Sequence, residues 1–309
     1  MSAILTLVAN REATSLTPQD IALASTLAAG GETTILSPGE AVDIACAPLT
    51  PAQIDAICLA LTDRAIDVLY GPSENRRRKI LVADMDSTIV ANETLDDIAV
   101  HAERIRPGIG EEVAAVTRRS MNGEIDFQTS LRNRVAFLRD LPASLLEDAW
   151  KDVKINPGAR TLVQTMKANG AATALVSGGF TWFTARVGAA CGFAENHANI
   201  LNVTGDTLDG TVGEPILGPD AKLQHLIRIA ATAGAPLSAA LTIGDGANDL
   251  PMLRAAGLGI GFHAKPVVRK EIVNRIEHGT LRTALFAQGY RASELVEDYG
   301  VSSVKQDDD

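Results

Sequence analysis

The sequence is poor in cysteine, in aromatic residues and in positive charge, and each shortage disfavours a class of protein. The 309 residues include 3 cysteines, widely spaced and in no CxxC pair, which argues against a disulfide scaffold and favours a reduced, cytoplasmic protein. Aromatic residues make up 4% of the chain, so we expect an aliphatic core. A net charge of −10 disfavours a nucleic-acid partner, because phosphate contacts need clustered lysine and arginine.

Long apolar runs are also missing. No stretch approaches the roughly 20 apolar residues of a membrane span. The N-terminal stretch MSAILTLVANREATS has no basic segment and too short an apolar run for a signal peptide, so we expect no membrane partner. The 5 histidines show no HExxH spacing, which argues against a zinc hydrolase. The absence of a GxxxxGK[ST] loop excludes a P-loop nucleotide site.

The first 75 residues alternate short strand-like and helix-like segments. Their order, β-α-β-β-α-β, predicts a small α+β domain of the ferredoxin-like type. We expect strands at 3–9, 32–36, 41–47 and 66–70, and helices at 18–28 and 51–62. The stretch GPSENRRRK that follows is rich in turn-forming residues, and it is predicted to be a solvated linker.

From residue 80 onward, strands and helices alternate, which favours a parallel sheet with helices on both faces. The sequence therefore predicts an α/β, Rossmann-like core domain within 80–300. Segment 92–155 interrupts the alternation with several helices, so it is predicted to be a helical cap inserted between core segments 80–91 and 156–300. A β-hairpin is expected around TGDTLDG.

Three predicted strands of this second half end on polar residues, each beside glycine or a second acid. ILVAD ends at Asp84, ALVS ends at Ser177, and LTIGD ends at Asp245. Ser and Asp are turn formers, so a single such end could arise by chance. In open α/β sheets, however, ligands bind outside the carboxyl ends of the strands. We therefore expect the three side chains to meet at one site.

The residues expected at this edge combine ligands for a cation with donors for an anion. Asp84, Asp86 and Asp245 offer the oxygen ligands that Mg²⁺ prefers. The expected anion donors are a hydroxyl, backbone N–H groups at a predicted helix start, and the ammonium of a lysine predicted to open a helix. They belong to Ser177, Gly178, Gly179 and Lys222. A cation, amides and a lysine together indicate phosphoryl transfer.

The paired acids Asp84 and Asp86 are predicted to have different roles. With Mg²⁺ neutralising both partners, Asp84 can attack phosphorus and form an aspartyl-phosphate. Asp86 lies on the same face two residues later, where it can protonate the leaving alkoxide and then accept a proton from the attacking water. Asp86 must hold a proton at the first step, and a neighbouring acid raises its pKa.

Four segments, DMDST, VSGG, AKLQHL and GDGANDL, resemble the four motifs of the haloacid dehalogenase superfamily of phosphatases. Within that superfamily, DMDSTIVANE and MNGEIDFQTSLRNRV are similar to segments of the phosphoserine phosphatases, and the resemblance covers about residues 80–290. It implies Mg²⁺-dependent hydrolysis of O-phospho-L-serine to L-serine and phosphate, the last step of serine biosynthesis. Asp84, Asp86 and Lys222 would be catalytic, and the metal would be held by Asp84, Asp245 and the backbone carbonyl of Asp86.

The resemblance also implies a set of substrate-binding residues. They are Glu93, Met121, Phe127, Arg134, Ser177, Gly178 and Asn248, with Thr88 and Asp249 supporting the loops. Glu93 would meet the ammonium of the substrate and Arg134 its carboxylate, while Met121 and Phe127 would wall the pocket. A zwitterionic amino acid needs one acid and one base, and arginine binds carboxylates in a bidentate way.

The N-terminal segment resembles ACT-type regulatory domains in the order of its elements. Its first turn, ANREATS, lacks the glycine that amino-acid-binding ACT modules usually carry, so serine sensing and a structural or dimerising role both stay open. Two other functions also stay open. One is phosphoryl transfer to another alcohol such as homoserine, and the other is a non-catalytic amino-acid sensor. The presence of all four of Asp84, Asp86, Lys222 and Asp245 argues against the sensor.

Overall fold

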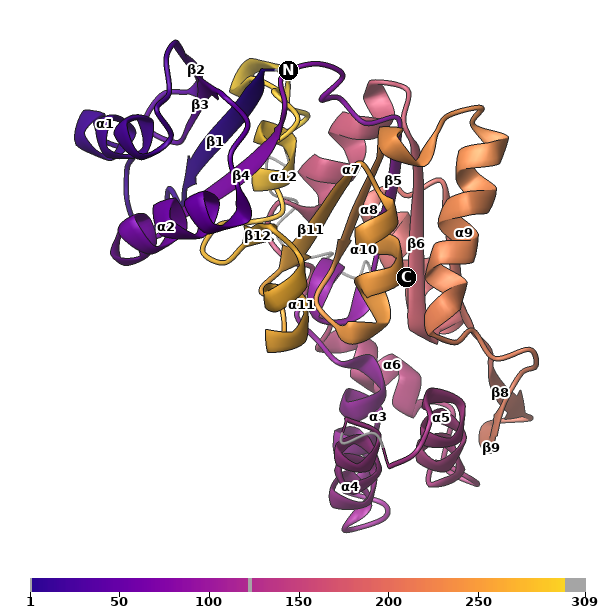
Figure 1. The fold of residues 1–309 in the computed structure, drawn as a ribbon. Coiled ribbons are helices and arrows are strands. Elements are labelled where there is room, and N and C mark those ends of the chain that lie inside the picture. The colour runs from indigo at the N-terminus through magenta and orange to yellow at the C-terminus, as the bar shows by residue number, and fades with distance from the viewer. Residues whose placement is uncertain (1, 122–123, 298–309) are drawn as a thin grey trace, which may run out of the picture.

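The computed structural model describes residues 2–121 and 124–297, and its N-terminal part is a small antiparallel sheet with two helices on one side (Figure 1). The strand order is β2-β3-β1-β4, as predicted for a ferredoxin-like domain. Each helix begins with a threonine capping box followed by proline, from Thr17 and Thr50. The elements are β1 (Ala3–Ala9), α1 (Pro18–Leu27), β2 (Thr33–Ser37), β3 (Ala41–Cys46), α2 (Pro51–Leu61) and β4 (Ile66–Pro72).

The second part contains a parallel sheet of six strands in the order β12-β11-β10-β5-β6-β7, which confirms the predicted α/β class. The strands are β5 (Ile80–Ala83), β6 (Ala172–Phe180), β7 (Glu195–Asn199), β10 (Ala240–Gly244), β11 (Leu258–Phe262) and β12 (Asn274–Ile276). The helices are α7 (Ala159–Ala168), α8 (Thr181–Cys191), α9 (Pro219–Thr232), α10 (Leu250–Ala255), α11 (Pro266–Glu271) and α12 (Thr283–Phe286).

Strand β5 lies at the centre of the sheet and buries both of its faces. Leu81 and Ala83 pack in the same hydrophobic cluster as residues of α7 and α8, whereas Ile80 and Val82 pack with residues of α9. This alternation follows from the two-residue period of a strand, so an uninterrupted apolar run is the correct pattern for a strand covered on both faces. Among the helices within the described ranges, none is long and apolar enough to cross a membrane.

The cap follows β5 and lies beyond the carboxyl ends of the core strands (Figure 1). Its helices are α3 (Thr94–Ala102), α4 (Ile109–Met121), α5 (Phe127–Ala136) and α6 (Leu145–Lys151). The expected hairpin is present as β8 (Leu201–Thr204) and β9 (Thr207–Val212). The hairpin is bonded to the cap, because the N–H of Asp140 donates to the carbonyl of Leu208 (2.9 Å) and that of Ala143 to Asp206 (2.8 Å).

The prediction that the segment GPSENRRRK is a solvated linker is wrong for two of its arginines. Arg78 is 8% exposed, and its guanidinium donates to the carbonyl oxygens of Ser238 (2.6 Å) and Gly257 (3.1 Å). Arg76 forms a two-pronged contact with the carboxylate of Asp43 at 2.5 and 3.0 Å. Buried carbonyls and carboxylates need donors, and the arginine fork supplies several at once. The segment therefore docks the two parts of the chain onto each other.

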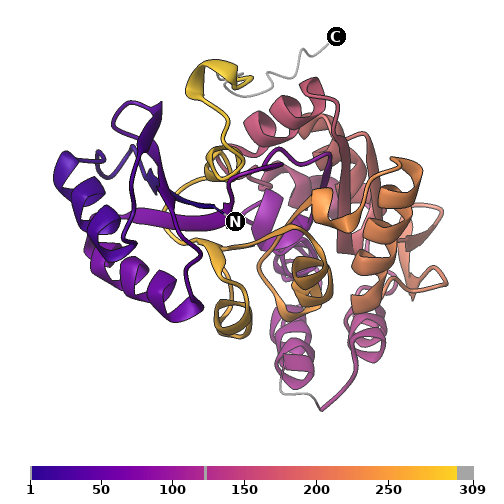
Figure 2. The same ribbon diagram turned by 45° about the horizontal axis from the view of Figure 1, so that its top comes forward.

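Further buried polar contacts fix the N-terminal domain to the β12 edge of the core. The carboxylate of Asp67 accepts from three consecutive backbone N–H groups, those of residues 277–279, at 2.8 to 3.0 Å. Arg282 donates to both carboxylate oxygens of Glu40 (2.9 and 3.1 Å), and both side chains are buried. Figure 2 shows the yellow C-terminal segments lying between the indigo N-terminal domain and the rest of the core.

Candidate active site

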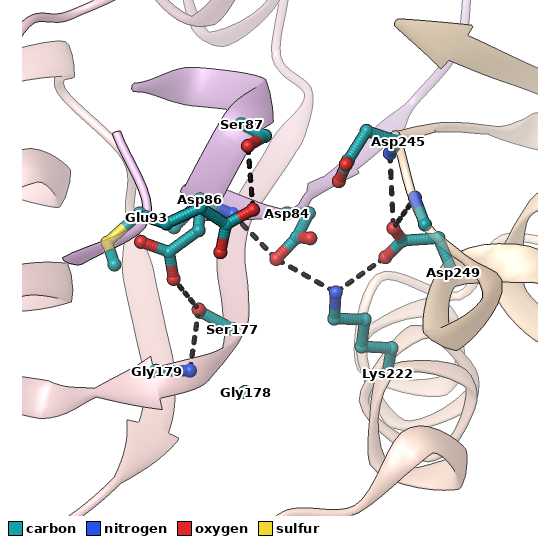
Figure 3. Close-up of polar contacts among 12 residues, drawn as sticks. Asp84, Asp86, Ser87, Glu93, Ser177, Gly178, Gly179, Lys222, Asp245 and Asp249 are labelled. Carbon is teal, nitrogen blue, oxygen red and sulfur yellow. Dashed lines mark hydrogen bonds and ion pairs between the residues drawn. The ribbon is translucent and has the colours of Figure 1, made fainter. Parts of the chain in front are cut away.

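The polar residues predicted to end three strands do meet at one edge of the sheet. β10, β5 and β6 are neighbours in the sheet, so Asp245, Asp84 and Ser177 lie at the same carboxyl edge, below which the cap sits. Figure 3 shows these side chains converging with Asp86 and Lys222. Ser177 does not end its strand as predicted, because β6 continues to Phe180, but the pairing of Ala83 with Leu175 places Ser177 close to the level at which β5 ends.

The two paired acids lie just after β5 and have different partners. The tight turn comes after both of them, at Ser87, whose φ is +54°. Asp84 Oδ1 accepts from the N–H of Met85 at 2.8 Å. Asp86 Oδ1 accepts from the N–H of Thr94 at 2.9 Å, and Asp86 Oδ2 accepts from Ser177 Oγ at 3.2 Å. Asp86 thus sits between the core and the first cap helix.

Thr88 is predicted to support this loop, and the side-chain contact that the structure gives it is made to its backbone carbonyl. Its carbonyl accepts from Asn156 Nδ2 at 2.7 Å. Its hydroxyl is buried and has no hydrogen-bond partner among the residues that the structure describes. The contact joins the two chain segments that lead into and out of the cap.

Lys222 is buried between two carboxylates. It lies in the first turn of α9, which begins three residues earlier than predicted, at Pro219. Its Nζ lies 2.8 Å from Asp84 Oδ1 and 2.5 Å from Asp249 Oδ1. Burial disfavours the ammonium, but the two carboxylates outweigh burial and raise the pKa of Lys222, so it stays protonated.

Asp249 is the residue that holds this arrangement together. Its Oδ1 receives Lys222, and its Oδ2 accepts from the N–H groups of Asp245 (3.1 Å) and Gly246 (3.0 Å). The Asp249 side chain is fully buried. Asp249 therefore links the loop after β10 to Lys222 of α9.

The environments of the two paired acids differ. Burial raises the pKa of Asp84 well above its ordinary value, and Asp249 adds to the rise, while Lys222 opposes it. Burial and the nearby carboxylate of Glu93 raise the pKa of Asp86 from 3.8 to about 6, while the hydrogen bond from the N–H of Thr94 opposes this rise. Both pKa values are raised, so the two acids differ in their neighbours: Asp84 contacts the ammonium of Lys222, which suits a nucleophile, whereas Asp86 lies near the carboxylate of Glu93, which suits a proton donor.

The raised pKa of Asp86 predicts a pH-dependent stability difference in metal-free protein. Between about pH 4 and about pH 6 the folded state retains this proton and the unfolded state does not, so wild-type stability falls as pH rises through that window. The side-chain amide of an Asp86→Asn variant does not titrate. We expect the melting temperature of the variant, relative to wild type, to be a few degrees higher at about pH 7.5 than at about pH 4.5. Thermal melts in chelator test this, and a pH-independent difference would contradict it.

Three carboxylates gather where the sequence predicts a metal. Oxygens of Asp84, Asp245 and Asp249 lie within 4.8 Å of one another, and all three residues are buried. Both Asp249 oxygens accept hydrogen bonds, whereas Asp84 Oδ2 and Asp245 Oδ1 have no such partner in the described part of the chain, so these two residues are the better placed to bind a metal. Burial raises the pKa of Asp245, and the charge of Asp249 raises it further, while the charge of Lys265 lowers it. This excess of buried negative oxygen fits a hard divalent cation.

Sequence reasoning missed Lys265, which also reaches the site. Its Nζ lies 3.0 Å from Asp245 Oδ2 and 3.8 Å from Glu93 Oε1. Glu93 is half-exposed and accepts from Ser87 Oγ at 2.8 Å. The sequence position of Lys265 could have indicated this, because Lys265 closely follows the carboxyl end of β11, the neighbour of β10 in the sheet.

A pocket beside Lys222 gathers most of the predicted anion-binding residues. It is lined by Phe127, Val176, Ser177, Gly178, Leu217, Gly218, Pro219, Ala221, Lys222 and Asn248. The ring of Phe127, from the cap, covers Gly178 so closely that a Cβ on Gly178 would lie 3.0 Å from Phe127 Cζ. A side chain at this position would therefore press on the Phe127 ring and push it away from the pocket by a few tenths of an ångström.

The two glycines after Ser177 do not open a helix, contrary to the prediction. They belong to β6, which continues to Phe180, and α8 begins only at Thr181. The N–H of Gly179 donates to Ser177 Oγ at 2.9 Å. The longer strand arises because β6 pairs with β7 again at Phe180 after an irregularity, which sequence alone does not reveal.

The predicted specificity residues of the cap lie on three helices or their ends. Glu93 precedes α3, Phe127 begins α5, and Arg134 lies in the last turn of α5. Burial lowers the pKa of Arg134, while the charges of Asp96, Glu93 and Asp86 oppose that effect. The Nε of Arg134 is buried and lacks a partner within the described part of the chain. Met121 ends α4, and its side chain lies outside what the structure describes.

Comparisons with known proteins agree with this geometry. The family model for haloacid dehalogenase-like hydrolases matches residues 81–254. The chain is 41% identical over 230 residues to a phosphoserine phosphatase of Streptomyces coelicolor, a match that covers 74% of this chain and 55% of the relative. It is 38% identical over 221 residues to a phosphoserine phosphatase of Streptococcus thermophilus, with 72% of this chain and 97% of the relative covered. The chain thus spans about half the length of the first relative and nearly all of the second.

Solved structures are similar over most of the chain, including its N-terminal domain. The crystal structure of a haloacid dehalogenase family hydrolase from Salmonella enterica has a TM-score of 0.80 at 29% identity, covering 93% of this chain and 98% of that one. The unliganded structure of a probable phosphoserine phosphatase from Vibrio cholerae has a TM-score of 0.75 at 30% identity, covering 93% of this chain and 86% of that one. Both cover the two domains together.

Proposed function

Because this chain belongs to the haloacid dehalogenase-like hydrolases, whose family model matches residues 81–254 of its 309, we propose that it hydrolyses O-phospho-L-serine to L-serine and phosphate with Mg²⁺ as the cofactor. Its place would be the last step of serine biosynthesis in the cytoplasm. The observation that carries the proposal is the position of Lys222. It contacts the nucleophile candidate Asp84 at 2.8 Å and also lines the pocket formed by Ser177 and Gly178.

The proposed reaction uses the two paired acids in turn. Asp84 attacks phosphorus, so that a bond forms from its carboxylate oxygen while the bond to the serine oxygen breaks. Asp86 donates its proton to that leaving oxygen, which its raised pKa favours. In the second step Asp86 accepts a proton from water, and the water oxygen displaces Asp84 from phosphorus. Mg²⁺, bound by Asp84 and Asp245, would supply the charge neutralisation that lets a phosphate dianion approach these carboxylates.

The phosphoryl oxygens are proposed to bind in the pocket beside Lys222. Lys222 offers a permanent positive charge, and Ser177 and Asn248 offer polar groups from the other walls. Such donors are already in place before the reaction, so they lower the barrier without a reorganisation cost. Phe127 covers the pocket from the cap and excludes water from it.

The selection of an amino-acid substrate is proposed to come from Glu93 and Arg134. The charges of Asp96, Glu93 and Asp86 all raise the pKa of Arg134 against the effect of burial, which supports a position of its guanidinium close to the reacting acids. Its unpartnered Nε is a free donor for the substrate carboxylate. Glu93 is half-exposed and can turn toward an ammonium group.

Removal of the Arg134 side chain should separate binding of the amino acid from chemistry at phosphorus. We expect Arg134→Ala to lower kcat/KM for phosphoserine by about 100-fold or more, because a charged hydrogen-bonded contact is lost. Activity on a small aryl phosphate, which has no carboxylate, should fall much less. The matched control is Arg132→Ala on the same helix, which removes an exposed arginine paired with Glu214 and should change neither rate. Equal loss on both substrates would argue against this role of Arg134.

Phosphate release from a panel of phosphorylated amino acids and sugars, with and without Mg²⁺, tests the function as a whole. Phosphoserine should be the best substrate, and chelation should stop the reaction. A preference for another ester, or full activity without divalent cations, would overturn the proposal. Product analysis in the presence of homoserine and other alcohols separates hydrolysis from phosphoryl transfer to an acceptor, because only transfer yields a new phosphate ester.

For the organisation of the chain we propose an ACT-like domain at 1–75 and a phosphatase domain at 80–300, with its cap at 92–155. The buried contact between Glu40 and Arg282 supports a structural role for the N-terminal domain. We also propose that this domain contributes to a homodimer. Sedimentation of the intact protein, compared with that of a chain that lacks residues 1–75, tests this part of the proposal.

A further inference from the structure

One buried asparagine connects two walls of the anion pocket. Asn199, the last residue of β7, is 2% exposed, and both ends of its side-chain amide are hydrogen-bonded. Its Nδ2 donates to the carbonyl oxygen of Gly178 at 2.8 Å. Its Oδ1 accepts from the N–H of Leu217 at 2.7 Å. Gly178 and Leu217 both line the pocket, whereas Asn199 itself lies behind them.

The wall that contains Leu217 depends on this contact. The segment between β9, which ends at Val212, and α9, which begins at Pro219, has no regular secondary structure. Among the described residues, its other hydrogen bonds outside α9 are made by residues before Leu217. The N–H of Gly213 donates to the carbonyl of Ile200, the N–H of Ile216 donates to Glu214 Oε2, and Arg132 donates to Glu214 Oε1. Leu217 immediately precedes Gly218, the residue before α9, and the first turn of α9 carries Lys222. Leu217 is therefore connected to Lys222 only through Gly218 and the first turn of α9, while the ammonium of Lys222 is held by Asp84 and Asp249.

The opposite wall depends on it as well. Gly178 follows Ser177, the residue that donates to Asp86, and the pairing between β6 and β7 is irregular between Val176 and Phe180. Across this irregular stretch the sheet does not hold Gly178 through regular pairing. The Nδ2 of Asn199 supplies the missing partner for its carbonyl.

Asn199 also stands at the base of the β8–β9 hairpin, which is bonded to the cap through Asp140 and Ala143. The chain leaves β7 at Asn199, passes through the hairpin, and returns to Asn199 at Leu217. A displacement of the cap that carries the hairpin with it would therefore act on the pocket at this asparagine.

We infer that Asn199 is a positioning residue for phosphoryl binding, which holds the Gly178 wall and the Leu217–Lys222 wall at the separation that fits a phosphoryl group. This inference rests on the proposed function and deepens it. Asn199 does not touch the substrate; it acts through the two walls. Its loss should therefore weaken the binding of any phosphate ester, whatever its leaving group.

Two variants separate the two bonds. Asn199→Ala removes both, and we expect affinity for orthophosphate in the presence of Mg²⁺ to fall by about 10- to 100-fold. We expect kcat/KM to fall by the same factor for phosphoserine and for an aryl phosphate, unlike the selective loss in Arg134→Ala. Asn199→Asp keeps the acceptor for Leu217 but places a carboxylate oxygen against the Gly178 carbonyl, and should bind orthophosphate no better than Asn199→Ala.

Asn196→Ala is the matched control, since Asn196 lies on the same strand and accepts from Thr184 Oγ1 at 2.8 Å, on the side of α8. Its orthophosphate affinity should equal that of wild type. A folded Asn199→Ala protein whose affinity lies within about twofold of wild type would overturn the inference.

A measurement on wild type covers the case in which the variants do not fold. Hydrogen exchange of the Leu217 amide should be slow and should slow further when orthophosphate binds, and exchange that is fast or insensitive to orthophosphate would also overturn the inference. Wild-type protein that binds orthophosphate without hydrolysing phosphoserine would contradict the proposed function alone, and the ratio of affinities would still decide the role of Asn199.

Discussion

Asp84→Asn is expected to abolish the hydrolysis of phosphoserine, with kcat lowered by about 10⁴-fold or more. The amide oxygen can still accept from the N–H of Met85 and from Lys222, so the geometry of the site should be retained. The amide is, however, a very poor nucleophile, so no bond to phosphorus forms. Steady-state phosphate release, measured with sensitivity for single turnovers, checks this expectation.

The control for this prediction is the melting temperature of the Asp84→Asn variant, which shows whether the variant folds. Because burial and Asp249 raise the pKa of Asp84 in the folded protein, loss of its charge should leave the melting temperature of metal-free protein unchanged or higher. A folded variant that keeps activity near that of wild type would rule out covalent catalysis by Asp84.

Lys222→Met is expected to have the second-largest effect, a loss of about 10³-fold or more in kcat/KM. Single preorganised donors contribute about 10²–10³-fold in other enzymes, and Lys222 adds a full charge to its hydrogen bonds. Its methylene stem is replaced by a side chain of similar length, so the packing of α9 should change little. A kcat/KM of the variant within a few-fold of the wild-type value would contradict the role proposed for Lys222.

Lys222→Met should also destabilise the metal-free protein. Its ammonium lies between Asp84 and Asp249, which are buried, and removal of one partner from a buried ion pair costs about 3–5 kcal/mol. Mg²⁺ should restore part of this loss, since a divalent cation can neutralise the same carboxylates. The matched control is Lys167→Met, because Lys167 is exposed on α7 and bonds only to the carbonyl of Gly192 among the contacts that the structure describes. That variant should melt like wild type.

The sequence was sufficient to predict the fold class and the convergence of three strand ends. Asp84, Ser177 and Asp245 could be placed together because parallel strands put their carboxyl ends at one edge, a rule that needs no coordinates. The cap could be predicted because its helices interrupt the alternation of strand and helix. Each of these inferences depends on periodicity along the chain, which the sequence records directly.

Other features depend on contacts between distant residues, and the sequence does not record those. Arg78 was predicted to be solvated because its neighbours form turns, yet it bonds to the carbonyl of Ser238, 160 residues further along the chain. Asn199 was not predicted as a site residue for the same reason, because its two hydrogen-bond partners lie 21 residues before it and 18 residues after it. Lys265 could have been found by applying the strand-end rule to β11 as well as to its neighbours.

The covalent role of Asp84 is tested most directly by trapping the intermediate. Wild-type protein would be mixed with phosphoserine and Mg²⁺, quenched in acid during turnover, and digested for mass spectrometry of the peptide that contains residues 80–92. We predict one added phosphoryl group on Asp84, absent when Mg²⁺ is chelated and absent in Asp84→Asn. Steady turnover without a phosphoryl group on Asp84, or with one on a different side chain, would contradict the mechanism.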